Sequence, residues 1–270
     1  MKWFSVSLLS LLVACSSERA FCQESGSPPG QSSVSSLGVC LGIGDFHIRD
    51  RYLSPFTFRG VLFASKVFYE LKNENDRHTA EVFFSTGGIE SGKPGADASQ
   101  YAGSLSYSYV RIVERFGVGG RPLEFGLGAG LSTFVTYTNF AAVDGGGYLS
   151  HSLNLLLRGE YRLEERRSVS VQLSMPTVRI VTRPDNGHHF SEFNNAIDQN
   201  ISRGLTKGRL ELPWENLVLL GECEYRQSLG GSLDLHCSYW FSYVASDRPD
   251  PILSMGQYMN RLLVGLVWLL

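Results

Sequence analysis

The sequence predicts an all-β fold, an up-and-down antiparallel transmembrane β-barrel of about ten strands. Three observations lead to this prediction. Segments in which apolar and polar residues alternate recur along the chain, the connections between them alternate between short and long, and no amphipathic helix is available to cover an apolar sheet face. The composition agrees, because 29 Gly, 12 Tyr and 16 Phe suit strands and tight turns better than helices.

Length and charge narrow the classes of partner. A chain of 270 residues is long enough for one large domain. Its formal net charge of -2 and the lack of a basic stripe or a nucleic-acid motif argue against a nucleic-acid partner. The sequence also shows no cofactor-binding or metal-binding pattern, so we expect neither a cofactor nor a metal.

The N-terminus predicts export. Lys2 precedes an apolar stretch, residues 3–14, that is too short to span a bilayer but right for the core of a secretory signal peptide. We expect a signal peptide over 1–22 with Gln23 as the first mature residue. Residues 12–15 also resemble a lipobox, so a lipoprotein signal over 1–14 with a lipidated Cys15 is the alternative. A flexible leader over 23–36, rich in Ser, Gly and Pro, would then precede a barrel over 37–270.

Ten segments carry the strand pattern, and many exceed the usual length of a soluble strand. They cover residues 37–48, 56–71, 78–85, 101–113, 123–138, 148–163, 168–181, 217–227, 232–244 and 258–270. Every second connection is short, namely 72–77, 114–122, 164–167 and 228–231. Short turns at one end and longer loops at the other are typical of an antiparallel meander closed into a membrane barrel.

One face of these strands is continuously apolar and the other carries charges, Ser and Gly. In a membrane barrel the apolar face meets lipid, so we expect the charges to line the lumen. The predicted lumen charge network consists of Glu124, Arg158, Glu160, Arg162, Glu222, Glu224, Arg226 and Asp234. Opposite charges on neighbouring strands would neutralise each other in a narrow lumen and form a plug. A path for an ion or small solute is the alternative.

A polar but uncharged group of residues lies farther along the same strands, toward the longer loops. It comprises Ser104, Ser106, Ser150, Ser152, Asn154, Ser238 and Ser242. These side chains would line a vestibule for a ligand. The loop over 182–214 carries His188, His189 and several acids, and a polar surface loop explains them without a catalytic or metal role.

Two cysteines offer a test of strand register. If residues 229–231 form a three-residue turn, Cys223 lies opposite Cys237 on the lipid face. A strained disulfide and two free apolar thiols both fit that placement.

Two stretches carry a resemblance to bacterial outer-membrane β-barrel proteins. The C-terminal residues Gly265, Trp268 and Leu270 match the barrel-assembly signal, although Leu263 stands where a polar residue is usual and Leu270 replaces the usual Phe. Residues 52–60, YLSPFTFRG, resemble the opening of a group of uncharacterised barrel proteins of the Bacteroidota. The resemblance implies the cell outer membrane as location, membrane lipid and the barrel-assembly machinery as partners, and no particular activity.

Together these observations predict a monomeric outer-membrane barrel with a narrow, charge-plugged lumen. It would serve as a structural or surface component or as a scaffold that binds a small ligand. The alternatives are a barrel enzyme that acts on protein or lipid, and a soluble lipocalin-like barrel that binds an apolar ligand. Fold alone does not choose among them.

Overall fold

The computed structural model describes residues 33–50, 56–93, 97–140, 146–182, 209–213, 216–246 and 255–270. Several predicted features lie outside these ranges. They are the signal peptide, residues 23–32 of the leader, residues 52–55 of the YLSP stretch and the histidines of the long loop. The strands are β1 (Val34–Asp50), β2 (Thr57–Lys72), β3 (Asp76–Glu90), β4 (Asp97–Val118), β5 (Arg121–Phe140), β6 (Gly146–Glu164), β7 (Arg167–Thr182), β8 (Arg209–Glu211), β9 (Asn216–Gly230), β10 (Leu233–Ser246) and β11 (Met255–Leu269).

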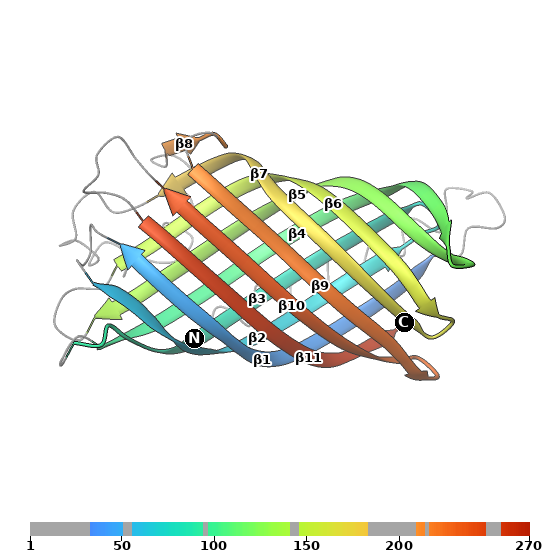
Figure 1. The fold of residues 1–270 in the computed structure, drawn as a ribbon, viewed down its shortest axis with the longest axis horizontal. Helices are drawn as coiled ribbons and strands as arrows, with labels where there is room; N and C mark the ends of the chain where they lie inside the picture. Colours follow the sequence, from blue (N-terminus) through green and yellow to red (C-terminus); the bar gives the residue numbers. More distant parts are fainter. Residues whose placement is uncertain are drawn as a thin grey trace. The chain divides into compact units, whose positions relative to one another are not determined.

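The strands form one closed antiparallel sheet (Figure 1). Its order is β6-β5-β4-β3-β2-β1-β11-β10-β9-β7-β8, with an additional pairing of β6 with β7, so the sheet returns on itself. The pairing of β1 with β11 joins the first and last strands and is the closure of the ring. Ten long strands make up the barrel, as predicted, and the short β8 is added on β7. The hairpins β2–β3, β4–β5, β6–β7 and β9–β10 lie at one end, here called the turn end, and the other is the loop end.

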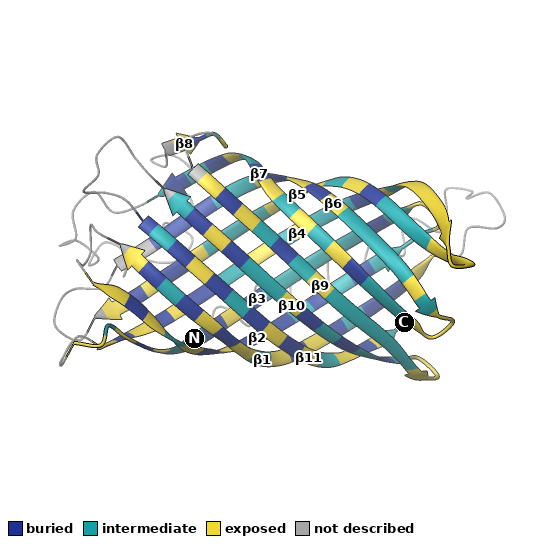
Figure 2. Ribbon diagram, in the orientation of Figure 1, coloured by how far each residue is buried: buried dark blue, intermediate teal, exposed yellow. Residues whose placement is uncertain are grey.

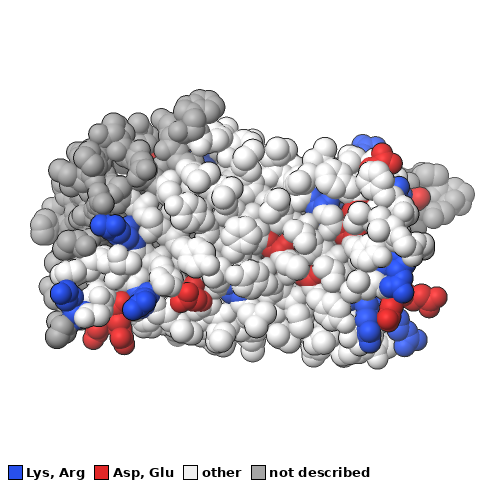
Figure 3. Space-filling view, viewed as in Figure 1, with Lys and Arg blue, Asp and Glu red and all other residues white. Residues whose placement is uncertain are grey.

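Alternation along each strand separates the two faces of the wall, which produces the chequered burial pattern of Figure 2. On β6, Leu153, Leu155 and Leu157 are 44%, 49% and 37% exposed on the outside, whereas Leu156 between them is buried inside. Uncharged side chains cover most of the visible outer face between the two ends (Figure 3). An apolar outer band around a charged interior is the polarity of a membrane barrel.

Aromatic side chains flank this band near the loop end. Tyr101 faces Tyr137 across β4 and β5, and Tyr243 faces Tyr258 across β10 and β11. All four are at least 36% exposed on the outer surface. Such rings are typical of the level where a barrel meets the lipid headgroups. None of the helices within the described ranges is long and apolar enough to cross a membrane.

Several element boundaries differ from the sequence prediction. β1 begins at Val34, three residues before the predicted start of the barrel at Leu37. β4 runs to Val118 and β5 begins at Arg121, so the predicted turn over 114–122 is in fact a two-residue turn. The bulge between Ile112 and Glu114 shifts the register within this hairpin, which the alternation alone did not indicate.

The register between β9 and β10 corrects the prediction for the cysteines. Cys223 lies opposite Tyr239, Cys237 lies opposite Tyr225, and both thiols are free. The physical reason is the hairpin, where Gly230 and Gly231 adopt φ of 110° and 61° and allow a tight turn. A bulge between Leu233 and Asp234 then shifts the pairing, so the expected three-residue turn does not form.

The interior is more apolar than the alternation suggested. Buried apolar side chains form one cluster around Phe46, Leu62 and Met259. A second cluster at the loop end contains Tyr148, Val181, Val218, Val244 and Met255. The predicted charges therefore occupy only part of the lumen, and large apolar side chains fill much of the rest.

Candidate functional site

The lumen contains a buried network of ion pairs whose centre is Glu224 on β9. One carboxylate oxygen of Glu224 accepts hydrogen bonds from Arg158 Nη2 at 2.7 Å and from Ser170 Oγ at 2.9 Å. The other oxygen lies 3.4 Å from His236 Nε2. Three strands thereby converge on one carboxylate, and the charge of Arg158 is neutralised inside the wall.

Lys66 of β2 forms a second group of ion pairs, which crosses the lumen. Its ammonium donates to Glu222 at 2.5 Å and lies 3.6 Å from Glu81. The Lys66 side chain is only 4% exposed, so water barely reaches its charge. The two carboxylates compensate this buried charge in place of water. Because Lys66 and Glu222 are 156 residues apart in the chain, this pair joins opposite parts of the sequence.

A third group of pairs lies at the turn end. Glu160 accepts from Arg77 at 2.5 Å and from Lys72 at 3.0 Å. Glu70 accepts from Arg226 at 2.9 Å and lies 3.6 Å from Arg77. Arg158 also lies 3.8 Å from Glu160, so these pairs are continuous with those around Glu224. These two groups are therefore connected, and together with the Lys66 group, which shares β9 with them through Glu222, they make up the charged layer.

The structure brings most of the predicted lumen charges into this layer. Glu124, Arg158, Glu160, Glu222, Glu224 and Arg226 all take part in ion pairs, Glu124 with Lys72 at 3.5 Å and with the more exposed Arg115 at 3.3 Å. Arg162 instead is exposed beside the β6–β7 turn. Asp234 is buried, but its Oδ1 has no hydrogen-bond partner among the described residues.

Sequence reasoning missed the partners on β2 and β3. These residues are Lys66, Glu70, Lys72, Arg77 and Glu81. The sequence does contain a signal for them. On β2, Lys66, Phe68, Glu70 and Lys72 lie at even positions, as do the buried Leu62 and Ala64, which places them all on the lumen face. The sequence prediction did not separate the two faces of β2 in this way.

Arg261 of β11 occupies a different environment from the paired charges. Its guanidinium carbon lies 3.4 Å from the centre of the Phe83 ring and 3.8 Å from that of Trp240. The side chain is buried, and its Nη2 has no hydrogen-bond partner in the described part of the chain. Stacking between two aromatic faces holds a cation without a directly bound carboxylate.

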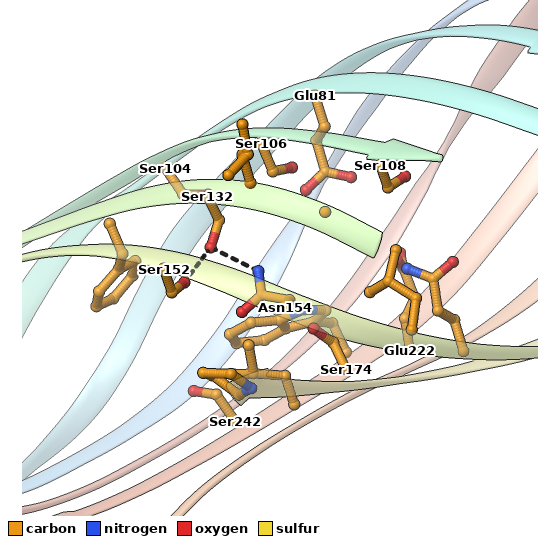
Figure 4. Close-up of a pocket in the computed structure, with 18 of the residues that line it drawn as sticks. Glu81, Ser104, Ser106, Ser108, Ser132, Ser152, Asn154, Ser174, Glu222 and Ser242 are labelled. Carbon is orange, nitrogen blue, oxygen red and sulfur yellow. Dashed lines mark hydrogen bonds between the residues drawn. The ribbon is translucent and has the colours of Figure 1, made fainter. Parts of the chain in front are cut away.

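A cavity of about 170 Å³ lies directly on the charged layer, toward the loop end. Lys66, Glu81, Glu222 and Glu224 contribute to its floor. Since a water needs roughly 10–15 Å³ by a comparable measure, the space would hold on the order of ten waters. Figure 4 shows the polar part of its wall.

Serines and one asparagine make a hydrogen-bonding row along this wall. Ser132 Oγ lies 2.7 Å from Ser152 Oγ and accepts from Asn154 Nδ2 at 3.0 Å, as the dashed lines in Figure 4 mark. Of the predicted vestibule residues, Ser104, Ser106, Ser150, Ser152, Asn154 and Ser242 line the cavity, and Ser238 does not. The row also includes Ser108, Ser132 and Ser174, which the prediction lacked.

Apolar side chains line much of the rest of the cavity. They comprise Phe134, Tyr148, Leu156, Pro176, Val218, Leu220, Trp240 and Val244. A ligand in this space would thus meet hydroxyls and amide groups on one wall and hydrocarbon on another.

A buried row of three side chains, a thiol, an imidazole and a carboxylate, lies beside the cavity. Cys40 Sγ is 3.3 Å from His236 Nδ1, and the other ring nitrogen faces Glu224. This order of thiol, imidazole and carboxylate matches the order in cysteine nucleophile sites. Cys40 and His236 are both fully buried and neither lines the cavity, so the thiol has no open face for a substrate in this structure.

No family model matches the chain, and no curated protein matches it. Solved structures do match. The outer membrane protease OmpT from Escherichia coli has a TM-score of 0.46 and 11% identity, with 92% of this chain and 99% of that chain covered. Neisserial surface protein A has a TM-score of 0.37 and 11% identity, covering 88% and 98%.

The attachment invasion locus protein Ail of Yersinia pestis, in complex with the heparin analogue sucrose octasulfate, has a TM-score of 0.34 and 9% identity, covering 87% of this chain and 99% of that chain. Because the TM-scores and sequence identities are this low, no activity of these proteins is inferred for this chain. The lipid-facing exterior, the closed ring of strands and the buried charges are properties of this chain's own structure.

Proposed function

We propose that this bacterial outer-membrane β-barrel, with its buried charged network, is a closed binding barrel rather than a channel. In this proposal the ion-pair layer blocks the lumen at the turn end, and the cavity above it binds a small ligand. The ligand would have an apolar body and a hydrogen-bonding head. The observation that carries the proposal is the position of the cavity, which lies on the charged layer between a polar row and an apolar wall.

The chemistry of the cavity supports this class of ligand. Four polar atoms of residues that line the cavity have no hydrogen-bond partner within the described ranges, namely Asn154 Oδ1, Arg158 Nε, Arg179 Nη1 and Arg261 Nη2. Buried polar atoms favour a partner. Hydroxyl or carboxylate oxygens are suited to the arginine donors and the serine row, while Val218, Leu220 and Trp240 suit a hydrocarbon body.

Filling the cavity tests the proposal. The probe is ω-bromooctanoic acid, whose bromine quenches tryptophan fluorescence, and Trp240 reports on it because its side chain lines the cavity. Quenching by a probe that is bound in the cavity saturates as the probe concentration rises. It is measured as the part of the total quenching that Trp240→Phe removes. Ser152→Phe places a ring in the cavity and is expected to abolish this saturable part.

The matched control is the neighbouring residue on the outer face. Leu153→Phe adds a similar ring on the lipid side, where Leu153 is 44% exposed, and is expected to leave the quenching of Trp240 unchanged. Unheated gel mobility shows that each variant is folded. Equal saturable quenching in Ser152→Phe and the native chain would overturn the proposal.

We infer that Gly265, Trp268 and Leu270 are recognised by the barrel-assembly machinery and that the barrel is a monomer. Support comes from β11, which pairs with β1 at the closure of the ring and leaves Trp268 41% and Leu270 64% exposed. The resemblance of residues 52–60 to uncharacterised Bacteroidota barrels and the export signal over 1–22 belong to the same proposal.

A further inference from the structure

The ladder of the barrel wall is interrupted between β7 and β9, beside the cavity. β9 pairs with β7 from Arg167↔Gln227 up to Ser174↔Leu220, and β7 then pairs with β8 from Arg179↔Glu211 onward. Within the described ranges, no ladder pair joins residues 175–178 of β7 to residues 216–219 of β9. We call this interruption the β7–β9 window.

The sequence of the window explains why the ladder stops. Pro176 stands in its middle and has no backbone N–H to offer to a neighbouring strand. The pairing of β7 with β6 also shifts here, because Leu153 faces Val178 while Asn154 faces Pro176, which leaves Thr177 as the extra residue. A proline and a bulge at the same point bend β7 away from a regular ladder.

The window joins the cavity to the lipid face. On the inner side Ser174, Pro176, Val218 and Leu220 line the cavity. On the outer side Met175, Val178, Leu217 and Leu219 are 47%, 36%, 53% and 45% exposed. Both surfaces of the wall are thus mainly apolar at this place, and among the described residues no ladder pair between β7 and β9 holds it closed.

We propose that the β7–β9 window is a lateral entrance, through which the cavity takes a single-chain amphiphile with an oxygen-bearing head directly from the membrane. The inference rests on the proposed function, since it assigns the ligand class and the route for that same cavity. An apolar chain passing between Pro176 and Val218 stays in contact with hydrocarbon throughout. The charged layer below offers no comparable path, because its side chains are paired across the lumen.

A reversible cross-link across the window tests the route. Continuing the β7–β9 register places Met175 opposite Leu219, so the test variant carries Met175→Cys and Leu219→Cys, with Cys223→Ser and Cys237→Ser to remove the other accessible thiols. The control uses a pair inside the intact ladder, native Cys223 with Val171→Cys, in a Cys237→Ser chain. A short bis-methanethiosulfonate reagent bridges each pair and dithiothreitol releases it.

The readout is the rate of Trp240 quenching after the full chain in phosphatidylcholine vesicles is mixed with vesicles that contain ω-bromooctanoic acid. The bridged window variant is expected to quench at least tenfold more slowly than the same variant after dithiothreitol, while the bridged control keeps the native rate. Equal rates for the bridged window, the bridged control and the native chain would overturn the lateral route. If the rates are equal but quenching of Trp240 still saturates at equilibrium, the lateral route is wrong and the proposed function stands. If the native chain shows no saturable quenching at all, the proposed function itself is refuted.

Discussion

Glu224 accepts hydrogen bonds from two side chains and contacts a third, and its carboxylate is the main counterion of the buried Arg158. Removal of one partner of a buried pair leaves the other charge without compensation. We expect Glu224→Gln to lower the free energy of unfolding by about 2–3 kcal/mol, less than a full deletion because the amide still accepts hydrogen bonds. Urea unfolding of the barrel in detergent micelles measures this difference.

The control for that substitution is an exposed pair. Glu164 and Arg167 lie 3.5 Å apart, with side chains 54% and 44% exposed, so Glu164→Gln should change the unfolding free energy by less than about 1 kcal/mol. The double variant Arg158→Met, Glu224→Gln should recover part of the loss, because it removes the stranded charge as well. Equal effects of Glu164→Gln and Glu224→Gln would show that the lumen pairs contribute no more than surface pairs.

At the level of strands, the closure between β1 and β11 depends on a close approach at Gly42. A Cβ added to Gly42 would lie 1.9 Å from the carbonyl oxygen of Leu262, which is backbone and cannot move aside. Gly42→Ala is therefore expected to cost about 1–3 kcal/mol through overpacking. Gly256→Ala in the same strand pair is the control, since no atom of the described residues lies within 4 Å of its added Cβ. Urea midpoints that coincide for the two variants would contradict this account of the closure.

The strands themselves could be predicted from the sequence because their pattern is local. Alternation in segments such as 155–163 identifies the lipid face without any knowledge of neighbours, and the number of long strands followed from it. Register could not be predicted in the same way. The pairing of Cys223 with Tyr239 depends on a bulge at Leu233 and on the positive φ of Gly230 and Gly231, which alternation does not reveal.

The same limit applied to the site. Half of the ion-pair layer was found from the charges on later strands, whereas Lys66 and Glu81 were missed because the two faces of β2 and β3 were not separated by parity. The row of serines was predicted in part, since small polar residues at alternate positions mark a lumen face. The window at Pro176 could not be predicted, because it requires knowing that β8 replaces β9 as the partner of β7.

For the whole molecule, the charged layer leads us to expect a barrel that does not conduct ions. We expect no steady conductance steps when the purified chain is added to a planar bilayer, because paired side chains fill the lumen around Lys66, Glu222, Glu224 and Arg158. Replacement of these four residues by Ser is the comparison that should increase the current if the layer is the barrier. Regular ohmic steps from the native chain would refute the closed lumen.

A second property of the whole molecule is the resistance of the closed ring to mild detergent. An antiparallel ring without an edge keeps its hydrogen bonds until the entire sheet unfolds. The unheated chain is therefore expected to migrate differently from the boiled chain on a gel, with circular dichroism confirming β structure in the unheated sample. Identical mobility of folded and boiled samples would argue against a closed barrel.

The long-range ion pairs also constrain the order in which the barrel can form. Lys66 and Glu70 lie on β2, yet their partners Glu222 and Arg226 lie on β9, 156 residues later in the chain. An assembly intermediate that holds only the early strands would keep Arg77 and Glu81 of β3 near these charges but would lack their closer counterions on β9, which is costly in a lipid environment. Insertion one hairpin at a time is therefore disfavoured. We therefore expect the late strands to be present before the early ones leave water, so that the barrel enters the membrane as a nearly complete sheet.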